Sequence, residues 1–255
     1  MFATSAQAAT TFPDFTVDPV GAFANFSADK ITGNYVEVAT FNPDGTFNVS
    51  LMWSAGSFVT NDGTTQLDAG DTGLGVSYGM YAFYKASGTV AQSGGKTTFT
   101  FTPGSGSLSL YLDGTRDNLK PVLAPTNGSG SFTIGNSGND TLLATGIALS
   151  GQGTLDPTLP TCGSGTGTGI NCGSFGSNTT FALTNAGGLF FVAPKPFFNL
   201  SFQSGQLNNF QPTGTQTING SLDVVFGVPE PTSLGLLGLG FLGLGAAAKR
   251  RKQAK

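Results

Sequence analysis

Carboxylates are the side chains of this sequence that could support acid–base or metal chemistry. The sequence has 14 acidic residues and no histidine. Without histidine, a Ser-His-Asp triad, a histidine general acid or base and the ordinary zinc sites are excluded. Two carboxylates held ~5–9.5 Å apart could still hydrolyse a glycosidic bond. An enzyme that acts on polysaccharide through aspartates is therefore one hypothesis.

Glutamate is rare in the sequence, which contains only Glu37 and Glu230. Glu37 lies between Val36 and Val38 in a run with strand character. Because successive residues of a strand point to opposite faces, Glu37 is expected to face away from the two valines. We therefore interpret it as an outward, solvated charge and not as a catalytic acid.

An Asp-rich segment could supply oxygen ligands to calcium. Its candidate ligands are Asn61, Asp62, Asp68 and Asp71. The segment lacks the spacing of an EF-hand, and Asp and Asn are also ordinary turn formers. Asp113 and Asp117, on either side of Gly114, form a weaker candidate of the same kind. We expect no cofactor, with calcium as the alternative.

Aromatic side chains could stack on sugar rings, because they combine a flat apolar face with a polar group. Trp53 alternates with Val49 and Leu51, so we expect it in the core. Tyr81 is expected to be exposed, on the face opposite Tyr78. The candidates are Tyr35, Tyr78, Tyr81, Tyr84, Tyr111 and Trp53.

The elements that must position these side chains have the period of β-strands. In residues 46–53, Phe47, Val49, Leu51 and Trp53 share one face. The same alternation occurs at Phe99/Phe101, Leu108/Leu110/Leu112, Phe132/Ile134, Phe181/Leu183, Phe198/Leu200/Phe202 and Leu222/Val224/Phe226. Turn sequences separate these runs, at 42–45, 61–63, 94–95, 113–114 and 219–220. Many short strands with such spacing predict an all-β fold, a single β-sandwich-like domain.

The composition narrows the class of protein. Charged residues make up 10% of the sequence, whereas it contains 39 glycines and 22 phenylalanines. Residues 1–228 carry thirteen acidic and six basic side chains. So acidic a chain is a poor binder of nucleic acid. Its aromatic content is enough to fill a core, and its surface is expected to be rich in Thr, Ser, Asn and Gly.

The C-terminal residues form three consecutive parts. The triplet Pro229, Glu230 and Pro231 cannot extend a helix or a central strand. The uncharged residues 232–248 are predicted to form a helix of ~25 Å, just enough to cross a thin membrane. The cations behind it favour a cytoplasmic C-terminus. They are Lys249, Arg250, Arg251 and Lys252.

This order of parts resembles the PEP-CTERM sorting signal of Gram-negative bacteria. The resemblance implies a C-terminal transmembrane sorting helix and recognition by an exosortase, a membrane enzyme thought to cut near the Pro-Glu-Pro motif. The main part of the chain would then be exported across the inner membrane. It would act at the cell surface or in the extracellular matrix. A plain membrane anchor that is never cut is the alternative.

The N-terminal residues are consistent with export. Ala6 and Ala8 form an A-x-A site for signal peptidase, with the mature chain starting at Ala9. Only five residues precede this site, so a basic region and an apolar region are missing in front of it. We therefore divide the chain into residues 1–8, a remnant of the signal peptide, 9–227, the exported β-rich domain, and 228–255, the sorting signal.

The two cysteines are expected to form a disulfide. Cys162 and Cys172 are separated by a Gly- and Thr-rich segment. An even number of cysteines in an exported chain favours a disulfide. A metal site would need more ligands than these two cysteines.

The main part of the sequence also resembles the flocculation-associated PEP-CTERM proteins of floc-forming bacteria. The segments that carry this resemblance are 15–19, 28–35, 73–79 and 220–226. It implies an exported, non-enzymatic protein that supports cell aggregation through association with exopolysaccharide, and it brings no catalytic residues. The alternatives are the aspartate-based enzyme and the uncleaved membrane-anchored domain.

Overall fold

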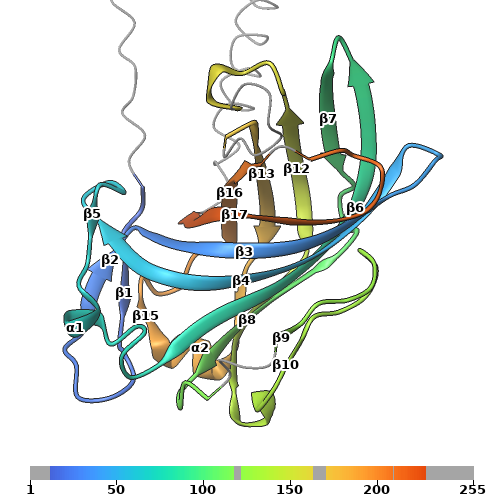
Figure 1. The fold of residues 1–255 in the computed structure, drawn as a ribbon. Coiled ribbons are helices and arrows are strands. Elements are labelled where there is room, and N and C mark those ends of the chain that lie inside the picture. Colours follow the sequence, from blue (N-terminus) through green and yellow to red (C-terminus); the bar gives the residue numbers. More distant parts are fainter. Residues whose placement is uncertain (1–11, 118–121, 163–170, 209, 228–255) are drawn as a thin grey trace, which may run out of the picture.

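The computed structural model describes residues 12–117, 122–162, 171–208 and 210–227. These residues form a closed barrel of eight antiparallel strands, together with smaller sheets and short helices (Figure 1). In the order in which they pair around the barrel, the strands are β6 (Gly79–Ser93), β7 (Lys96–Phe101), β12 (Ala148–Leu155), β13 (Gly173–Thr180), β16 (Leu200–Leu207), β17 (Gly214–Gly227), β3 (Lys30–Phe41) and β4 (Thr46–Thr60). The ring closes because β4 pairs with β6.

The remaining strands extend or cover this barrel. A short side sheet continues from β6 through β8 (Ser107–Asp113), β11 (Thr141–Gly146) and β14 (Ala182–Leu183). A three-stranded sheet contains β15 (Phe191–Ala193), β1 (Phe15–Val17) and β2 (Phe26–Ala28). The other short elements are β5 (Thr65–Gln66), β9 (Val122–Leu123), β10 (Thr133–Ile134), α1 (Ala69–Thr72), α2 (Asn185–Phe190), η1 (Ser137–Asn139) and η2 (Pro160–Cys162).

The prediction of an all-β fold is confirmed, but the prediction of a β-sandwich is wrong. The reason lies in β6, which uses both of its edges. One edge pairs with β4, and the other pairs first with β8 over residues 79–85 and then with β7 over residues 88–93. The ring therefore continues from β6 through β7, while β8 begins the side sheet. Closure leaves no unpaired edge in the ring of strands.

The interior face of β4 is the one that its alternation predicts. Phe47, Val49, Leu51 and Trp53 are each at most 4% exposed. The indole nitrogen of Trp53 donates a hydrogen bond of 3.0 Å to the carbonyl oxygen of Leu222 on β17, the second strand from β4 in the ring. The expectation that Trp53 belongs to the core is confirmed.

Glu37 faces the barrel interior, so our interpretation of it as an outward charge is wrong. Register decides the face: Tyr35 pairs with Trp53 and Glu37 pairs with Leu51, both inward residues of β4. Val38 lies on the outer face and is nevertheless only 2% exposed. A loop over residues 124–131 covers that part of the outer face, where Gly128 N donates to Thr40 Oγ1. The outer wall can therefore bury a valine, and local alternation alone does not reveal which face is inside.

Turn sequences are found where predicted, with one exception. Residues 42–45, 61–63 and 94–95 directly follow strands, and residues 113–114 lie at the end of β8. Asn219 and Gly220 instead lie inside β17. Gly220 is required there, because a Cβ atom would lie 2.7 Å from the Tyr35 ring and 2.7 Å from the Gln206 carbonyl oxygen. The glycine serves close packing and not a turn.

Phenylalanine fills both ends of the barrel. The cluster beside the β1–β2–β15 sheet contains Phe15, Phe58, Phe181, Phe191, Phe197 and Phe226. The cluster at the other end contains Phe41, Phe47, Phe99, Phe101 and Phe210. Between them lies a cavity of about 40 Å³ whose lining includes Trp53, Tyr84 and Gln203. The core is thus continuous along the barrel.

Candidate functional sites on the outer wall and at the end of β8

An amide-lined pocket opens on the outer wall of the barrel, where β3, β17 and β16 lie side by side. It has a volume of about 470 Å³. Its lining includes four amide side chains and the exposed Val36. It also includes Gly220, where the absence of a side chain leaves a gap that we call the glycine notch. The amides belong to Asn34, Gln206, Asn208 and Asn219.

The pocket is held in shape by hydrogen bonds to backbone atoms. The Tyr35 hydroxyl donates to the Gln206 carbonyl oxygen at 3.0 Å, behind the glycine notch. The Asn208 side-chain nitrogen donates to the Asn219 carbonyl oxygen at 2.6 Å. The Asn34 and Gln206 side chains are exposed. Each presents one donor and one acceptor group to a ligand, the combination that sugar hydroxyls can use.

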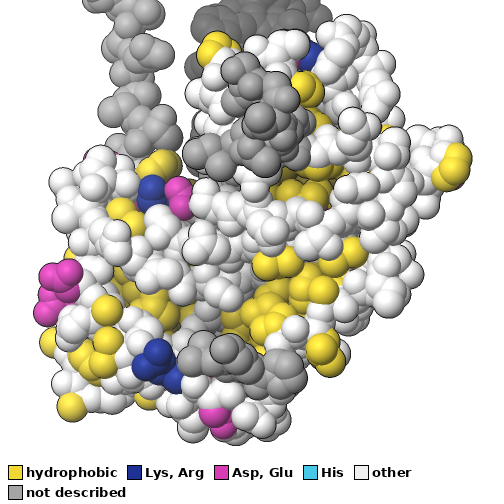
Figure 2. Space-filling model, viewed as in Figure 1, with side chains coloured by type: hydrophobic (Ala, Val, Ile, Leu, Met, Phe, Trp, Pro, Cys, Tyr) yellow, Lys and Arg dark blue, Asp and Glu magenta, His cyan; other side chains and the backbone are white. Residues whose placement is uncertain are grey.

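The surrounding wall is also polar and uncharged. Thr154, Ser174 and Gln206 are paired across β12, β13 and β16 and all three are exposed. Figure 2 shows the face over β17, β3 and β4, on which uncharged polar side chains and backbone predominate and charged side chains are few. This face suits a neutral or weakly charged ligand better than a strongly charged one.

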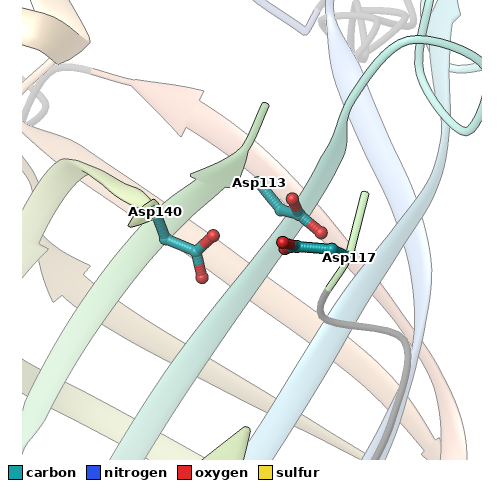
Figure 3. A group of neighbouring side chains, drawn as sticks. All are labelled: Asp113, Asp117 and Asp140. Atoms are coloured by element: carbon teal, nitrogen blue, oxygen red, sulfur yellow. The ribbon is translucent and has the colours of Figure 1, made fainter. Parts of the chain in front are cut away.

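Three aspartates converge at the end of β8 (Figure 3). Asp113 ends the strand, Asp117 lies in the following turn, and Asp140 follows η1. One carboxylate oxygen from each lies within 4.8 Å of the others. Asp113 is buried, at 3% exposed, whereas Asp117 is exposed.

Hydrogen bonds fix this carboxylate cluster. Asp113 Oδ1 accepts from Thr115 N at 3.1 Å, and Asn139 Nδ2 donates to Asp117 Oδ2 at 3.3 Å. The Tyr81 hydroxyl donates to Asp140 Oδ2 at 2.5 Å. Burial, followed by this hydrogen bond, raises the pKa of Tyr81. The tyrosine therefore remains a neutral donor to the cluster at every physiological pH.

The geometry of the carboxylate cluster is relevant to both hypotheses for the aspartates, hydrolysis of a glycosidic bond and binding of calcium. Asp113 is buried and is therefore inaccessible to a polymer. This arrangement does not favour hydrolysis. It brings together oxygen atoms of the kind that calcium prefers. Sequence reasoning named Asp113 and Asp117 but missed Asp140, because no spacing motif connects residues on separate loops.

Calcium binding stays a prediction. Asp62, Asp68 and Asp71 do not converge, and within the described part of the chain the one group of three acidic side chains close enough to share an ion is the carboxylate cluster. Asp62 instead accepts a hydrogen bond of 3.3 Å from Phe12 N. To test this prediction at the cluster, calcium is titrated into the full chain and into Asp117→Asn, and the melting temperature of each is measured. Calcium binding at the cluster should raise the melting temperature of the full chain more than that of the variant.

The tyrosine prediction needs correction. Tyr81 is 5% exposed and stacks on Tyr111, with ring centroids 5.2 Å apart. Its expected exposure is therefore wrong. Tyr35 and Tyr78 are also buried, at no more than 2% exposed. These buried rings cannot stack on a sugar.

The disulfide between Cys162 and Cys172 is present. It closes the connection between β12 and β13, which pair along their whole length. Beside it, Lys96 Nζ lies 2.7 Å from Asp156 Oδ2. This contact, together with hydrogen bonds from Thr158, lowers the pKa of Asp156 to about 2.

The export signals predicted from sequence lie outside the described residues. These are Ala6 and Ala8, the triplet Pro229, Glu230 and Pro231, the helix over 232–248, and Lys249, Arg250, Arg251 and Lys252. Within the part of the chain that is described, no helix has both the length and the apolar character needed to cross a membrane.

A comparison with protein families bears directly on the C-terminal residues. Residues 227–252 match the family model described as the PEP-CTERM protein-sorting motif. The chain carries a PEP-CTERM sorting motif. This motif indicates export, processing by an exosortase, and a surface or extracellular location after processing. No curated protein and no solved structure matches the chain.

Proposed function

We propose that the exported barrel binds the polysaccharide of the extracellular matrix, without turning it over, and thereby supports cell aggregation. The PEP-CTERM sorting motif carries this proposal, because it directs the barrel to the compartment where the polymer is found. The amide-lined pocket and the uncharged wall around it support the chemistry.

The pocket has the groups that sugar recognition needs. Its volume of about 470 Å³ is within the ~300–1,000 Å³ typical of ligand sites. Amides at Asn34 and Gln206 can pair with adjacent hydroxyls, while Val36 offers an apolar contact for a ring face. Each such contact in water is weak. Display of many copies on a cell would turn weak contacts into adhesion.

An assay that separates polysaccharide binding from polysaccharide cleavage tests this mechanism. The full chain is incubated with purified exopolysaccharide, and both retention on the polymer and release of reducing ends are measured. We expect retention and no release. The double variant Asn34→Ala/Gln206→Ala should lose at least about tenfold in affinity, because two amide contacts are removed. The matched control is Asn178→Ala, which removes an outward amide of β13 that lies outside the pocket.

A genetic experiment tests the biological role. Deletion of the gene should disperse flocs while secreted polysaccharide stays normal. The intact gene should restore settling, and a gene lacking Pro229–Lys255 should not, because its product has no sorting signal. Unchanged flocs after deletion would contradict the aggregation role. Release of reducing ends that disappears in Asp→Asn variants would instead support the enzyme.

A further inference from the structure

Glu37 places a carboxyl group inside the barrel, in a second cavity near the end formed by Phe41 and Phe47. Protein atoms surround the carboxyl group, and the side chain keeps partial accessibility because it borders this cavity. Neither the amide-lined pocket nor the carboxylate cluster includes this residue.

Six of the ten residues that line the cavity are aromatic. Apart from Glu37, its other side chains are aliphatic, from Val49, Leu207 and Ile218. The aromatic side chains are Phe41, Phe47, Phe99, Phe101, Phe175 and Phe210. Phe210 stacks on Phe41 and on Phe99, each with a centroid distance of 5.9 Å, and Phe41 and Phe99 contact each other in a tilted arrangement at 5.8 Å. The rings therefore form a packed wall and not a set of loose side chains.

Nothing in the described residues neutralises the Glu37 carboxyl group. No hydrogen bond or ion pair joins it to any of them; the ion pairs that they form are Lys30–Asp223 and Lys96–Asp156. The titratable groups that interact with it are the hydroxyls of Tyr35 and Tyr84, whose pKa values are raised, mainly by burial. Burial also raises the pKa of Glu37, to about 7.

The lining determines which class of ligand would fit. A calcium or alkali ion needs several oxygen ligands, and the side chains here supply only the one carboxylate. An organic ammonium group needs a negative charge and aromatic faces, because ring faces attract cations electrostatically. The Glu37 cavity supplies both.

The size of the cavity limits the ligand further. Its volume of about 30 Å³ holds about two water molecules. Methylammonium is no larger than such a pair, whereas tetramethylammonium is much larger. Phe210 also borders an open surface groove of about 450 Å³, so the cavity lies one ring away from solvent. A longer alkyl amine could lie in this groove with its ammonium group in the cavity.

We propose that Glu37 and the surrounding phenylalanine rings form a binding site for a small protonated amine. The carboxylate supplies the charge, the rings supply the faces that contact the methyl and ammonium groups, and the barrel wall excludes water. This site is independent of the polysaccharide proposal, since the two use opposite faces of β3.

Carbon-13 NMR of glutamate carboxyls tests the proposal in the full chain. The chain has two glutamates, Glu37 and Glu230, so labelling yields two side-chain signals. Addition of methylammonium chloride should move the Glu37 signal to its ionised position and lower its apparent pKa. The Glu230 signal is the internal control. Equal shifts of both signals, or no shift of Glu37, would overturn the proposal.

Matched salts and variants define the site. Potassium chloride at the same concentration should have no effect, and tetramethylammonium should bind at least about tenfold more weakly than methylammonium because it is larger than the cavity.

Glu37→Gln should abolish the rise in melting temperature that methylammonium produces, whereas Asp14→Asn, at an exposed carboxylate, should retain it. If Glu37→Gln does not fold, the NMR titration alone decides. A rise of equal size with potassium chloride would mean that only ionic strength is at work.

Discussion

The carboxyl group of Glu37 should make the stability of the barrel depend on pH. Burial raises its pKa from 4.5 to about 7. Between these values the folded state binds more protons than the unfolded state, so stability falls as pH rises. This contribution is complete below pH ~4.5 and is lost as the pH rises through ~7.

Replacement of Glu37 by glutamine should remove that dependence. We expect Glu37→Gln to match the wild type at pH 4 and to exceed it by ~1–3 kcal/mol at pH 8, because the variant has no charge to bury. Urea unfolding in an amine-free buffer at both pH values measures the difference. Asp14→Asn is the control and should leave the pH profile unchanged. Equal profiles for wild type and Glu37→Gln would contradict the buried titration.

At the scale of an element, β17 depends on a glycine at its centre. Gly220→Ala would place a methyl group 2.7 Å from the Tyr35 ring and from the Gln206 carbonyl oxygen. We expect a loss of ~1–3 kcal/mol from this overpacking. It should also weaken polysaccharide binding, because Gly220 forms the notch of the amide-lined pocket. Chemical denaturation and the retention assay measure the two effects.

The matched control for this change is Gly188→Ala in helix α2. A Cβ atom at Gly188 meets nothing within 4 Å. Alanine there should be neutral or stabilising by up to ~1 kcal/mol, because it favours the helix. Destabilisation by both variants alike would mean that β17 has no special packing constraint.

The disulfide is a second constraint at this scale, between β12 and β13. Cys162→Ser/Cys172→Ser should lower the free energy of unfolding by ~2–3 kcal/mol, since the unfolded chain gains the freedom of an open loop. Urea unfolding of the variant, beside wild type with and without a reductant, measures this. Reduction should reproduce the effect in wild type and leave the double variant unchanged.

Local pattern predicted the elements better than it predicted their arrangement. The alternation of Phe47, Val49, Leu51 and Trp53 identified the inner face of β4, because apolar and polar residues separate clearly there. The same reasoning failed at Glu37, where the valines on both sides occupy the outer face and a distant loop buries one of them, Val38. The amide-lined pocket was also missed, since Asn34, Gln206 and Asn219 meet only through the pairing of three strands. Barrel closure could not be predicted either, because it depends on the shared edge of β6.

At the scale of the whole molecule, the sorting motif predicts a change in mass on export. The exported form should lack the basic tail that begins at Lys249, because processing is expected near Pro229. Intact mass spectrometry of the protein from the medium and from the cell envelope measures this. A variant with Pro229→Ala and Pro231→Ala should accumulate uncut in the membrane. An exported wild-type protein with its full C-terminus would favour the uncleaved anchor.

The position of β17 links the completion of the fold to the arrival of the C-terminal segment. This strand fills the gap between β16 and β3, and its residues 214–224 pair with residues 31–41 near the start of the domain. A chain that emerges from N- to C-terminus holds both neighbouring edges open until β17 follows. Because β17 ends at Gly227 and the sorting motif spans 227–252, the ring can close only when the membrane-directed segment is itself about to emerge. The last strand of the ring and the sorting motif are thus consecutive in the chain, and a chain that ends before them would expose the unpaired edges of β16 and β3 to its neighbours.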